Sequence, residues 1–245
     1  MVKLSKAHTK FIKSLQLKKY RQLEQTFLVE GEKSVLEVID SDFEITEIIA
    51  TSKFRSLHGH LLESLSVLES EDLSAIGTLK SNDAAIALVR MKPEQPFAVT
   101  SGLTLLSDGI NDPGNFGTIL RVADWYGINR ICASPDTCEL YNPKVISSSK
   151  GSFTRVEVSY AELDTVIATA GLPVYAADMS GRNVHSFKFP EDCLLVMGNE
   201  SHGISASLEA LITERLTIPS FGGAESLNVG VATAIMLDNY RRLHH

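Results

Sequence analysis

At 245 residues, of which 44% are hydrophobic, the chain is long enough to bury at least one full core, and its length suits two domains. No apolar run approaches the roughly 20 residues that span a bilayer, and the N-terminus lacks a signal peptide's apolar segment, so we expect a folded cytoplasmic protein without a membrane partner. The net charge of −7 argues against a uniformly basic nucleic-acid-binding protein.

Positive charge is nevertheless concentrated at the start of the chain. Residues 1–23 carry +7, and the remainder carries −14, because the first acidic residue is Glu24. The basic side chains of this arm are Lys3, Lys6, Lys10, Lys13, Lys18, Lys19 and Arg21. Such an arm suits a polyanionic partner. The alternative is a solvated, frayed helix that has no partner.

The first 91 residues alternate between strand and helix patterns. Strands are predicted at 27–31, 45–52, 67–70 and 84–91, and helices at 31–40, 53–65 and 71–79. This indicates a small α/β domain over residues 1–91. The segment KPEQPFAVTSG at 92–102 has the composition of a linker, so we place the second domain at 103–245.

The second domain begins with LTLLSDG at 103–109, an apolar run that suits a strand covered on both faces. Further strands are predicted at 130–134, 173–179, 193–198 and 216–220, and helices at 114–127, 161–171, 205–213 and 226–243, with VISSSKGSF at 145–153 continuing the alternation. This alternation predicts a parallel sheet with helices on both faces.

Polar residues that could form a site first occur in DGINDPGNFGTILRVAD at 108–124. Asn115 stands where a helix begins and could simply cap it. Arg121 lies off the apolar face of that helix, and helical side chains lean toward the N-terminus, so its guanidinium can reach back toward Asn115. A planar guanidinium beside a helix start suits a phosphate or a carboxylate, although a surface salt bridge is the alternative.

The second such segment is LLVMGNESHGIS at 194–205. Gly198 ends a buried strand and would let the backbone approach a ligand at the carboxyl edge of the sheet. Glu200 and His202 follow on the loop. Glu200 could instead be an anion at a helix start, and His202 an ordinary surface residue.

The third segment is IPSFGGAESLNVG at 218–230, in which either Ser226 or Asn228 could only be a helix cap. The helix that follows is apolar on nearly every face. We therefore expect it to be buried all round, in part at a subunit interface.

Metal and redox chemistry find little support in the sequence. Cys132, Cys138 and Cys193 show no CxxC spacing, so we interpret them as buried, reduced thiols. His58 and His60 lack a third ligand nearby, and we predict no metal site. The sequence also has no GxGxxG, GxxxxGK[ST], GxSxG or HExxH motif.

Three of these segments together resemble motifs of the SpoU/TrmH family of RNA ribose 2′-O-methyltransferases, in the SPOUT superfamily. The matching motifs are NFGTILRVA at 115–123, VMGNESHGIS at 196–205 and IPSFGGAESLNVGVA at 218–232. The segment FLVEGEKSVLEVI at 27–39 is similar to the substrate-binding domain of many members, whose fold is related to that of ribosomal RNA-binding proteins. One departure is Gly230, where the family often has serine.

The resemblance implies a deep C-terminal trefoil knot whose loops hold S-adenosylmethionine, and a homodimer that completes the active site. Cofactor contacts map to Ala177, Met197, Gly198, Ile218 and Leu227, and the functional polar residues to Asn115, Arg121, Glu200, Ser226 and Asn228. It also implies methyl transfer to a ribose 2′-hydroxyl, in which Arg121 accepts the proton. Because arginine stays protonated in proteins, we favour phosphate binding and charge stabilisation for Arg121.

The resemblance favours ribosomal RNA as the partner because the N-terminal domain is similar to that of rRNA-modifying members. Three alternatives stay open: methylation of tRNA ribose, methylation of a base, and a non-catalytic RNA-binding protein that retains the fold. The nucleotide that is methylated does not follow from the sequence.

Overall fold

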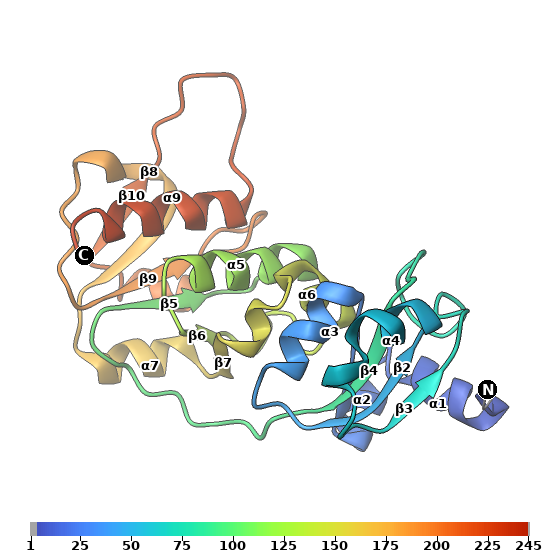
Figure 1. The fold of residues 1–245 in the computed structure, drawn as a ribbon. Coiled ribbons are helices and arrows are strands. Elements are labelled where there is room, and N and C mark those ends of the chain that lie inside the picture. The colour runs from blue at the N-terminus through green and yellow to red at the C-terminus, as the bar shows by residue number, and fades with distance from the viewer. Residues whose placement is uncertain (1–3, 245) are drawn as a thin grey trace. The chain divides into compact units, whose positions relative to one another are not determined.

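The computed structural model describes residues 4–244 and divides the chain into two compact units, each described by itself below (Figure 1). The first unit runs to Pro93 and also includes Leu140–Thr154, and the second comprises Glu94–Glu139 and the chain from Arg155 onward. None of the helices in residues 4–244 combines the length and the apolar composition of a membrane-spanning segment. The domain limits at residues 91 and 103 stay a prediction.

The first unit is built on a four-stranded sheet with the order β1-β4-β2-β3. Its strands are β1 (Thr26–Glu30), β2 (Ile45–Ala50), β3 (Val67–Glu69) and β4 (Ala85–Arg90). β4 pairs antiparallel with both β1 and β2, whereas β2 and β3 are parallel. All five residues of β1 are buried, so this strand forms part of the core rather than a solvated edge.

Among the described residues, five α-helices belong to the first unit. They are α1 (Lys6–Ser14), α2 (Lys18–Glu24), α3 (Glu32–Ile39), α4 (Ser52–His58) and α6 (Pro143–Ser149), with a 3-10 turn η1 at Gly59–Leu61 and another, η2, at Ser152–Thr154. The prediction that VISSSKGSF continues the alternation of the second domain was wrong, because α6 packs on β1 in the first unit.

The helix predicted at 71–79 is absent from the described structure, where this segment forms turns. The buried Glu30 carboxylate explains the difference. It accepts hydrogen bonds from the backbone N–H of Thr78, at 2.9 Å, and of Leu79, at 3.3 Å. A Cβ on Gly77 would lie 3.0 Å from the carboxyl carbon of Glu30. These contacts replace the i to i−4 bonds of Thr78 and Leu79, whereas the N–H of Gly77 still donates to the carbonyl of Leu73 at 2.9 Å.

The basic N-terminal segment is part of the folded unit rather than a frayed arm. Ile12 of α1 and Leu15 are fully buried in the core. Arg21 is only 2% exposed, and it donates to the carbonyl oxygens of Leu15 and Gln16 at 2.9 and 2.8 Å. Arg21 was counted among the basic side chains of the arm, but its burial removes it from the surface that could meet a polyanion. The exposed cations here are Lys6, Lys10, Lys13, Lys18 and Lys19, and Lys3 lies outside the described residues.

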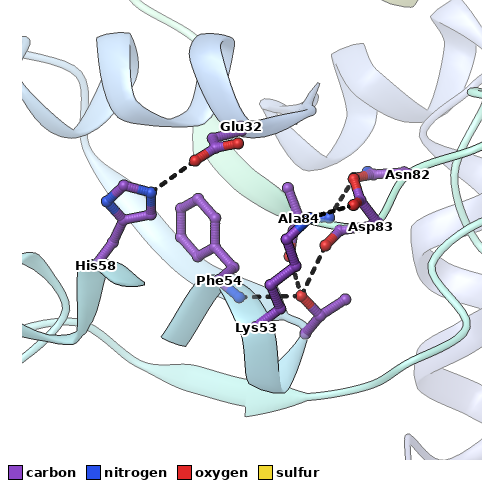
Figure 2. Close-up of polar contacts among 8 residues, drawn as sticks. Glu32, Lys53, Phe54, His58, Asn82, Asp83 and Ala84 are labelled. Carbon is purple, nitrogen blue, oxygen red and sulfur yellow. Dashed lines mark hydrogen bonds and ion pairs between the residues drawn. The ribbon is translucent and has the colours of Figure 1, made fainter. Parts of the chain in front are cut away.

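The surroundings of α4 explain one of the histidines that were weighed as metal ligands. Figure 2 shows the His58 imidazole directed at the Glu32 carboxylate, and Nε2 lies 2.8 Å from Oε1. Thr51 caps the helix by accepting the N–H of Phe54 and donates to the carbonyl of Asp83. Across residues 4–244, no group of three or more His, Cys, Asp or Glu side chains is placed to hold a metal ion.

The second unit contains a six-stranded sheet in which every neighbouring pair is parallel. In spatial order the strands are β10 (Glu214–Thr217), β8 (Val174–Asn183), β9 (Cys193–Met197), β5 (Leu103–Ser107), β6 (Arg130–Ala133) and β7 (Glu157–Tyr160). The predicted α/β fold with a parallel sheet is confirmed. Strand β7 was not predicted.

Helices cover both faces of this sheet, and Figure 1 shows α5 and α9 on one side and α7 on the other. The helices are α5 (Pro113–Trp125), α7 (Leu163–Ala170), α8 (Ala206–Glu209) and α9 (Val229–Arg241), with a 3-10 turn η3 at Val184–Ser186. Leu163, Ile167 and Leu208 pack with Leu106 and Val196 in one core. The predicted apolar face of α5 is fully buried.

In the single chain the final helix is buried on part of its surface, and burial of the rest at a subunit interface stays a prediction. Met236 and Leu237 are buried, but 47% of Val231 is exposed. Where the family often has serine, a Cβ on Gly230 would lie 2.7 Å from Cγ2 of Thr118 on α5. Glycine at this position therefore allows α9 to pack closely on α5.

Two of the three cysteines should be chemically inert in the native protein. Cys132 and Cys193 are fully buried, and burial raises the pKa of each thiol to about 12. At pH 8 the reactive thiolate is then only about one part in 10⁴. We expect neither thiol to react with a disulfide reagent until the protein is denatured, as measured by thiol titration before and after adding guanidinium. Fast native labelling of either residue would contradict this expectation.

Candidate functional site

The start of α5 places Asn115 for a role other than capping. Asp112 is the cap, because its Oδ1 accepts the backbone N–H of Asn115 at 3.0 Å, and Pro113 occupies the first helical position. The alternative interpretation of Asn115 as the cap was therefore wrong. The Asn115 amide is left to bond with side chains from other segments.

Asn115, Glu200 and Asn228 form a hydrogen-bonded cluster. Asn115 Nδ2 donates to Glu200 Oε1 at 2.7 Å, and Asn228 Nδ2 donates to Asn115 Oδ1 at 2.9 Å and to Glu200 Oε1 at 3.3 Å. These residues come from three distant segments, each within a motif that the sequence singled out. The cluster lies on the exposed surface of the second unit, where it can meet a substrate.

Two members of the cluster also serve the start of α9. Asn228 Oδ1 accepts the N–H groups of Gly230 and Val231 at 3.0 and 3.4 Å, so Asn228 is the helix cap. Glu200 Oε1 accepts the N–H of Val229 at 3.4 Å, which places its negative charge at a helix N-terminus. Asn228 and Glu200 therefore stabilise the start of α9 and also belong to the cluster, so the two interpretations of each residue do not exclude each other.

Arg121 and Ser226 do not join this cluster. Arg121 is exposed on α5, and Asn115 lies six residues earlier, which corresponds to about 9 Å along a helix. Ser226 is exposed in the loop before α9. In the described part of the chain, neither side chain has a hydrogen-bond or ion-pair partner. Both remain free to bind a ligand.

The loop after β9 closes on itself. The backbone groups of Asn199 and Gly203 exchange two hydrogen bonds, at 2.8 and 2.9 Å. A Cβ on Gly198 would lie 2.6 Å from the carbonyl carbon and oxygen of Gly203. A side chain at position 198 would therefore collide with the loop, and the predicted approach of a ligand to the Gly198 backbone stays a prediction. His202 is exposed.

Asn199 is a residue of this loop that did not stand out in the sequence. Its Oδ1 accepts the N–H groups of Ser201 and His202, and its Nδ2 donates to Gly109 O at 2.6 Å. An asparagine that directly follows a buried strand and a glycine is the signal that could have identified it.

Three of the residues predicted to contact the cofactor lie at the carboxyl ends of β9 and β10. Met197 is buried at the end of β9, Gly198 follows it, and Ile218 directly follows β10. Ala177 lies within β8 rather than at its end, because β8 bulges where Ala176 and Arg182 pair with consecutive residues of β10. Leu227 is 47% exposed in the loop before α9.

The loop between β10 and α9 offers unpaired backbone groups. Figure 1 shows this segment standing away from the sheet, and its residues 220–228 are exposed. Within the described chain, the N–H groups of residues 220–227 donate no backbone hydrogen bond. The Ser107 hydroxyl at the end of β5 is buried and has no partner among the described residues, and Ser107 pairs in register with Met197. Free backbone groups beside apolar side chains suit an adenosine moiety, so these residues fit S-adenosylmethionine.

Comparison with known proteins identifies both parts of the chain. Residues 102–238 match the model of the SpoU rRNA methylase family, and residues 6–84 match the MRM3-like substrate binding domain. The chain is 32% identical over 233 residues to the 23S rRNA (guanosine(2553)-2′-O)-methyltransferase RlmP of Bacillus subtilis, and the match covers 94% of both chains.

Solved structures agree with this match. A protein of the TrmH family from Porphyromonas gingivalis is 36% identical and superposes with a TM-score of 0.85, covering 98% of this chain and all of that one. The rRNA methyltransferase of Sinorhizobium meliloti with bound AdoMet is 25% identical, with a TM-score of 0.87, covering 100% of this chain and 98% of that one.

Proposed function

Because this chain belongs to the SpoU rRNA methylase family, we propose that it methylates a ribose 2′-hydroxyl of ribosomal RNA. The protein is an S-adenosylmethionine-dependent RNA ribose 2′-O-methyltransferase. The observation that carries the proposal is the cluster of Asn115, Glu200 and Asn228, which joins all three motifs beside the carboxyl edge of the sheet.

When bound, the cofactor supplies an electrophilic methyl group, so the protein has to position the hydroxyl and stabilise the charge that develops on its oxygen. Arg121 is free to bind a phosphate of the RNA and to stabilise that charge. Asn115 and Asn228 orient the reacting groups, and Ser226 donates a hydrogen bond to the substrate. Glu200 holds the two asparagines and the start of α9 in one arrangement.

The cofactor is held by Ala177, Met197, Gly198, Ile218 and Leu227 in this proposal. These residues offer apolar surface and backbone groups rather than charge, which suits the adenine ring and the ribose.

We also propose that the C-terminal segment forms the family's deep trefoil knot. Support comes from the strand order, in which the last strand, β10, lies beside β8 and not beside β9. Single-molecule unfolding would test this, because a knotted chain extends less than its full contour length.

The active form is proposed to be a homodimer. Support comes from apolar side chains that the single chain leaves exposed: Trp125 at the end of α5 is 84% exposed, Val231 on α9 is 47% exposed, and Leu243 is 46% exposed. In this proposal, a second subunit that covers α9 places its own side chains near Arg121 and completes the active site. Light scattering at micromolar concentration should give twice the chain mass of 26.8 kDa. A monomer would contradict the proposal.

The first unit is proposed to capture RNA through five exposed lysines, namely Lys6, Lys10, Lys13, Lys18 and Lys19. Replacing all five with glutamine should weaken RNA binding. It should also lower the slope of log affinity against log salt concentration by about 0.7 for each phosphate that the protein no longer neutralises. The expected Tm is unchanged because these side chains are exposed, whereas deleting residues 1–21 would remove Ile12 and Leu15 from the core.

A matched control replaces two lysines that already form ion pairs. Lys53 Nζ lies 2.6 Å from Asp83, and Lys92 Nζ lies 2.5 Å from Asp42. Glutamine at both positions should leave the salt dependence unchanged. An unchanged slope in the fivefold variant would exclude the lysines of α1 and α2 as phosphate contacts.

The substrate is tested by mapping 2′-O-methylation in total RNA from cells with and without the protein. The proposal predicts that one or more methylated sites disappear from ribosomal RNA. Disappearance of a site from tRNA would favour the alternative substrate, and an unchanged map would favour a non-catalytic RNA-binding protein. The cytoplasmic location stays a prediction that labelling in cells can test.

A further inference from the structure

The loop that carries Glu200 is fastened to the segment before α5 at two points. Asn199 Nδ2 donates to the carbonyl oxygen of Gly109 at 2.6 Å. At the other end of the loop, Asp108 Oδ2 accepts the N–H of Ser205 at 2.7 Å, and Asp108 is only 5% exposed. Both contacts lie within the second unit, and they connect the first motif of the site to the second.

Asn199 also determines the shape of the turn at Glu200. Its Oδ1 accepts the N–H of Ser201 at 2.8 Å and the N–H of His202 at 3.2 Å. Its backbone pairs with Gly203 across the loop. The Asn199 side chain therefore holds the two residues that follow Glu200, while the Glu200 carboxylate itself bonds to Asn115.

The segment that receives Asn199 leads directly into α5. Gly109 lies six residues before Asn115, and Asp112 in between caps the helix. A bond from Asn199 to Gly109 consequently sets where Glu200 stands relative to Asn115. We propose that Asn199 is a positioning residue for methyl transfer, which acts by holding Glu200 against Asn115 and Asn228. This inference rests on the proposed function of the cluster.

Asn199→Ala removes three hydrogen bonds without changing any residue of the cluster. A displacement of the order of 1 Å at a reacting group lowers rate by about 10²-fold. We therefore expect kcat to fall about 10²-fold, while KM for RNA and the Kd for S-adenosylmethionine change less than about threefold. Amide hydrogen exchange at Ser201 and His202 should accelerate by about tenfold in the free protein, because both amides lose their acceptor.

Asn199→Asp tests the two functions of the side chain separately. A carboxylate can still accept the N–H groups of Ser201 and His202, but it cannot donate to Gly109. We expect the amides to keep their slow exchange while kcat falls as in the alanine variant. If the aspartate variant keeps wild-type kcat, the bond to Gly109 does not position Glu200, and the proposal is overturned.

Asn82 provides a matched control in the first unit, because it too donates to a backbone carbonyl and accepts a backbone N–H. It donates to the carbonyl of Ala85 at 3.0 Å. It accepts the N–H of Ala84 at 3.1 Å (Figure 2). Asn82→Ala should lower Tm as much as Asn199→Ala and leave kcat unchanged.

An Asn199→Ala protein that loses only stability, with wild-type kcat at a temperature where it is folded, would show a purely structural role. Failure of the wild-type protein to methylate RNA would instead refute the proposed function.

Discussion

Arg121→Ala should abolish methyl transfer and leave cofactor binding intact. Arg121 is exposed and has no partner within the described residues, so its removal breaks no contact of the fold. If the guanidinium binds an RNA phosphate and stabilises the charge on the ribose oxygen, its loss raises the free energy of the transition state. Loss of one such donor costs on the order of 10³-fold in kcat. Calorimetry with S-adenosylmethionine and single-turnover methylation of RNA measure the two effects independently.

Arg121→Lys separates charge from geometry. A lysine keeps the positive charge but not the planar group that binds a phosphate through two parallel hydrogen bonds, so we expect a partial loss of activity. Arg130→Ala is the control, since Arg130 lies at the N-terminal end of β6 and pairs with Glu157 at 3.0 Å. It should retain wild-type kcat. A fully active Arg121→Ala protein would eliminate this residue from the mechanism.

The second large effect is expected for Glu200→Ala. One carboxylate oxygen, Oε1, accepts from Asn115, Asn228 and the N–H of Val229, so the substitution releases three groups together. We expect kcat to fall by about 10²-fold because the two asparagines lose their fixed orientation. Affinity for the cofactor should change little. Single-turnover kinetics at saturating cofactor give the rate of the methyl-transfer step.

The matched control for Glu200 is another exposed glutamate of the second unit. Glu162 lies at the start of α7, where its side chain makes no capping hydrogen bond. Glu162→Ala should therefore leave kcat unchanged. Equal losses of activity in the two variants would mean that the fall reflects a general change in charge, and the assigned role of Glu200 would be rejected.

Much of the second unit followed from its sequence because buried parallel strands and amphipathic helices leave clear patterns. The apolar run at 103–107 and the helix with Phe116 and Ile119 on one face were predicted correctly. In the first unit, the spacing of apolar residues at 71–79 predicted a helix that the structure does not contain. Leu73 and Ile76 have helical spacing, yet the segment forms turns, and at its end the Glu30 carboxylate binds the N–H groups of Thr78 and Leu79. Such a contact between distant residues leaves no local signal.

The site was partly predictable for the same reason. Asn115, Glu200 and Asn228 stand out because polar residues follow strands or open helices, and the structure brings these three together. Asn199 did not stand out, since its contribution is to bind backbone groups of neighbouring loops. Arg121 and Ser226 were predicted to belong to the same site, but neither side chain contacts the cluster. The role proposed for each is a contact with the substrate.

The most direct test of ribose methylation is a methyl-transfer assay with labelled S-adenosylmethionine and ribosomal RNA that lacks its modifications. After complete nuclease digestion, we expect the label in nuclease-resistant dinucleotides, because a 2′-O-methyl group blocks cleavage of the adjoining phosphodiester. Arg121→Ala run in parallel should give no labelled dinucleotide. Label that is found only in mononucleotides would place the methyl group on a base, and that result would contradict ribose methylation.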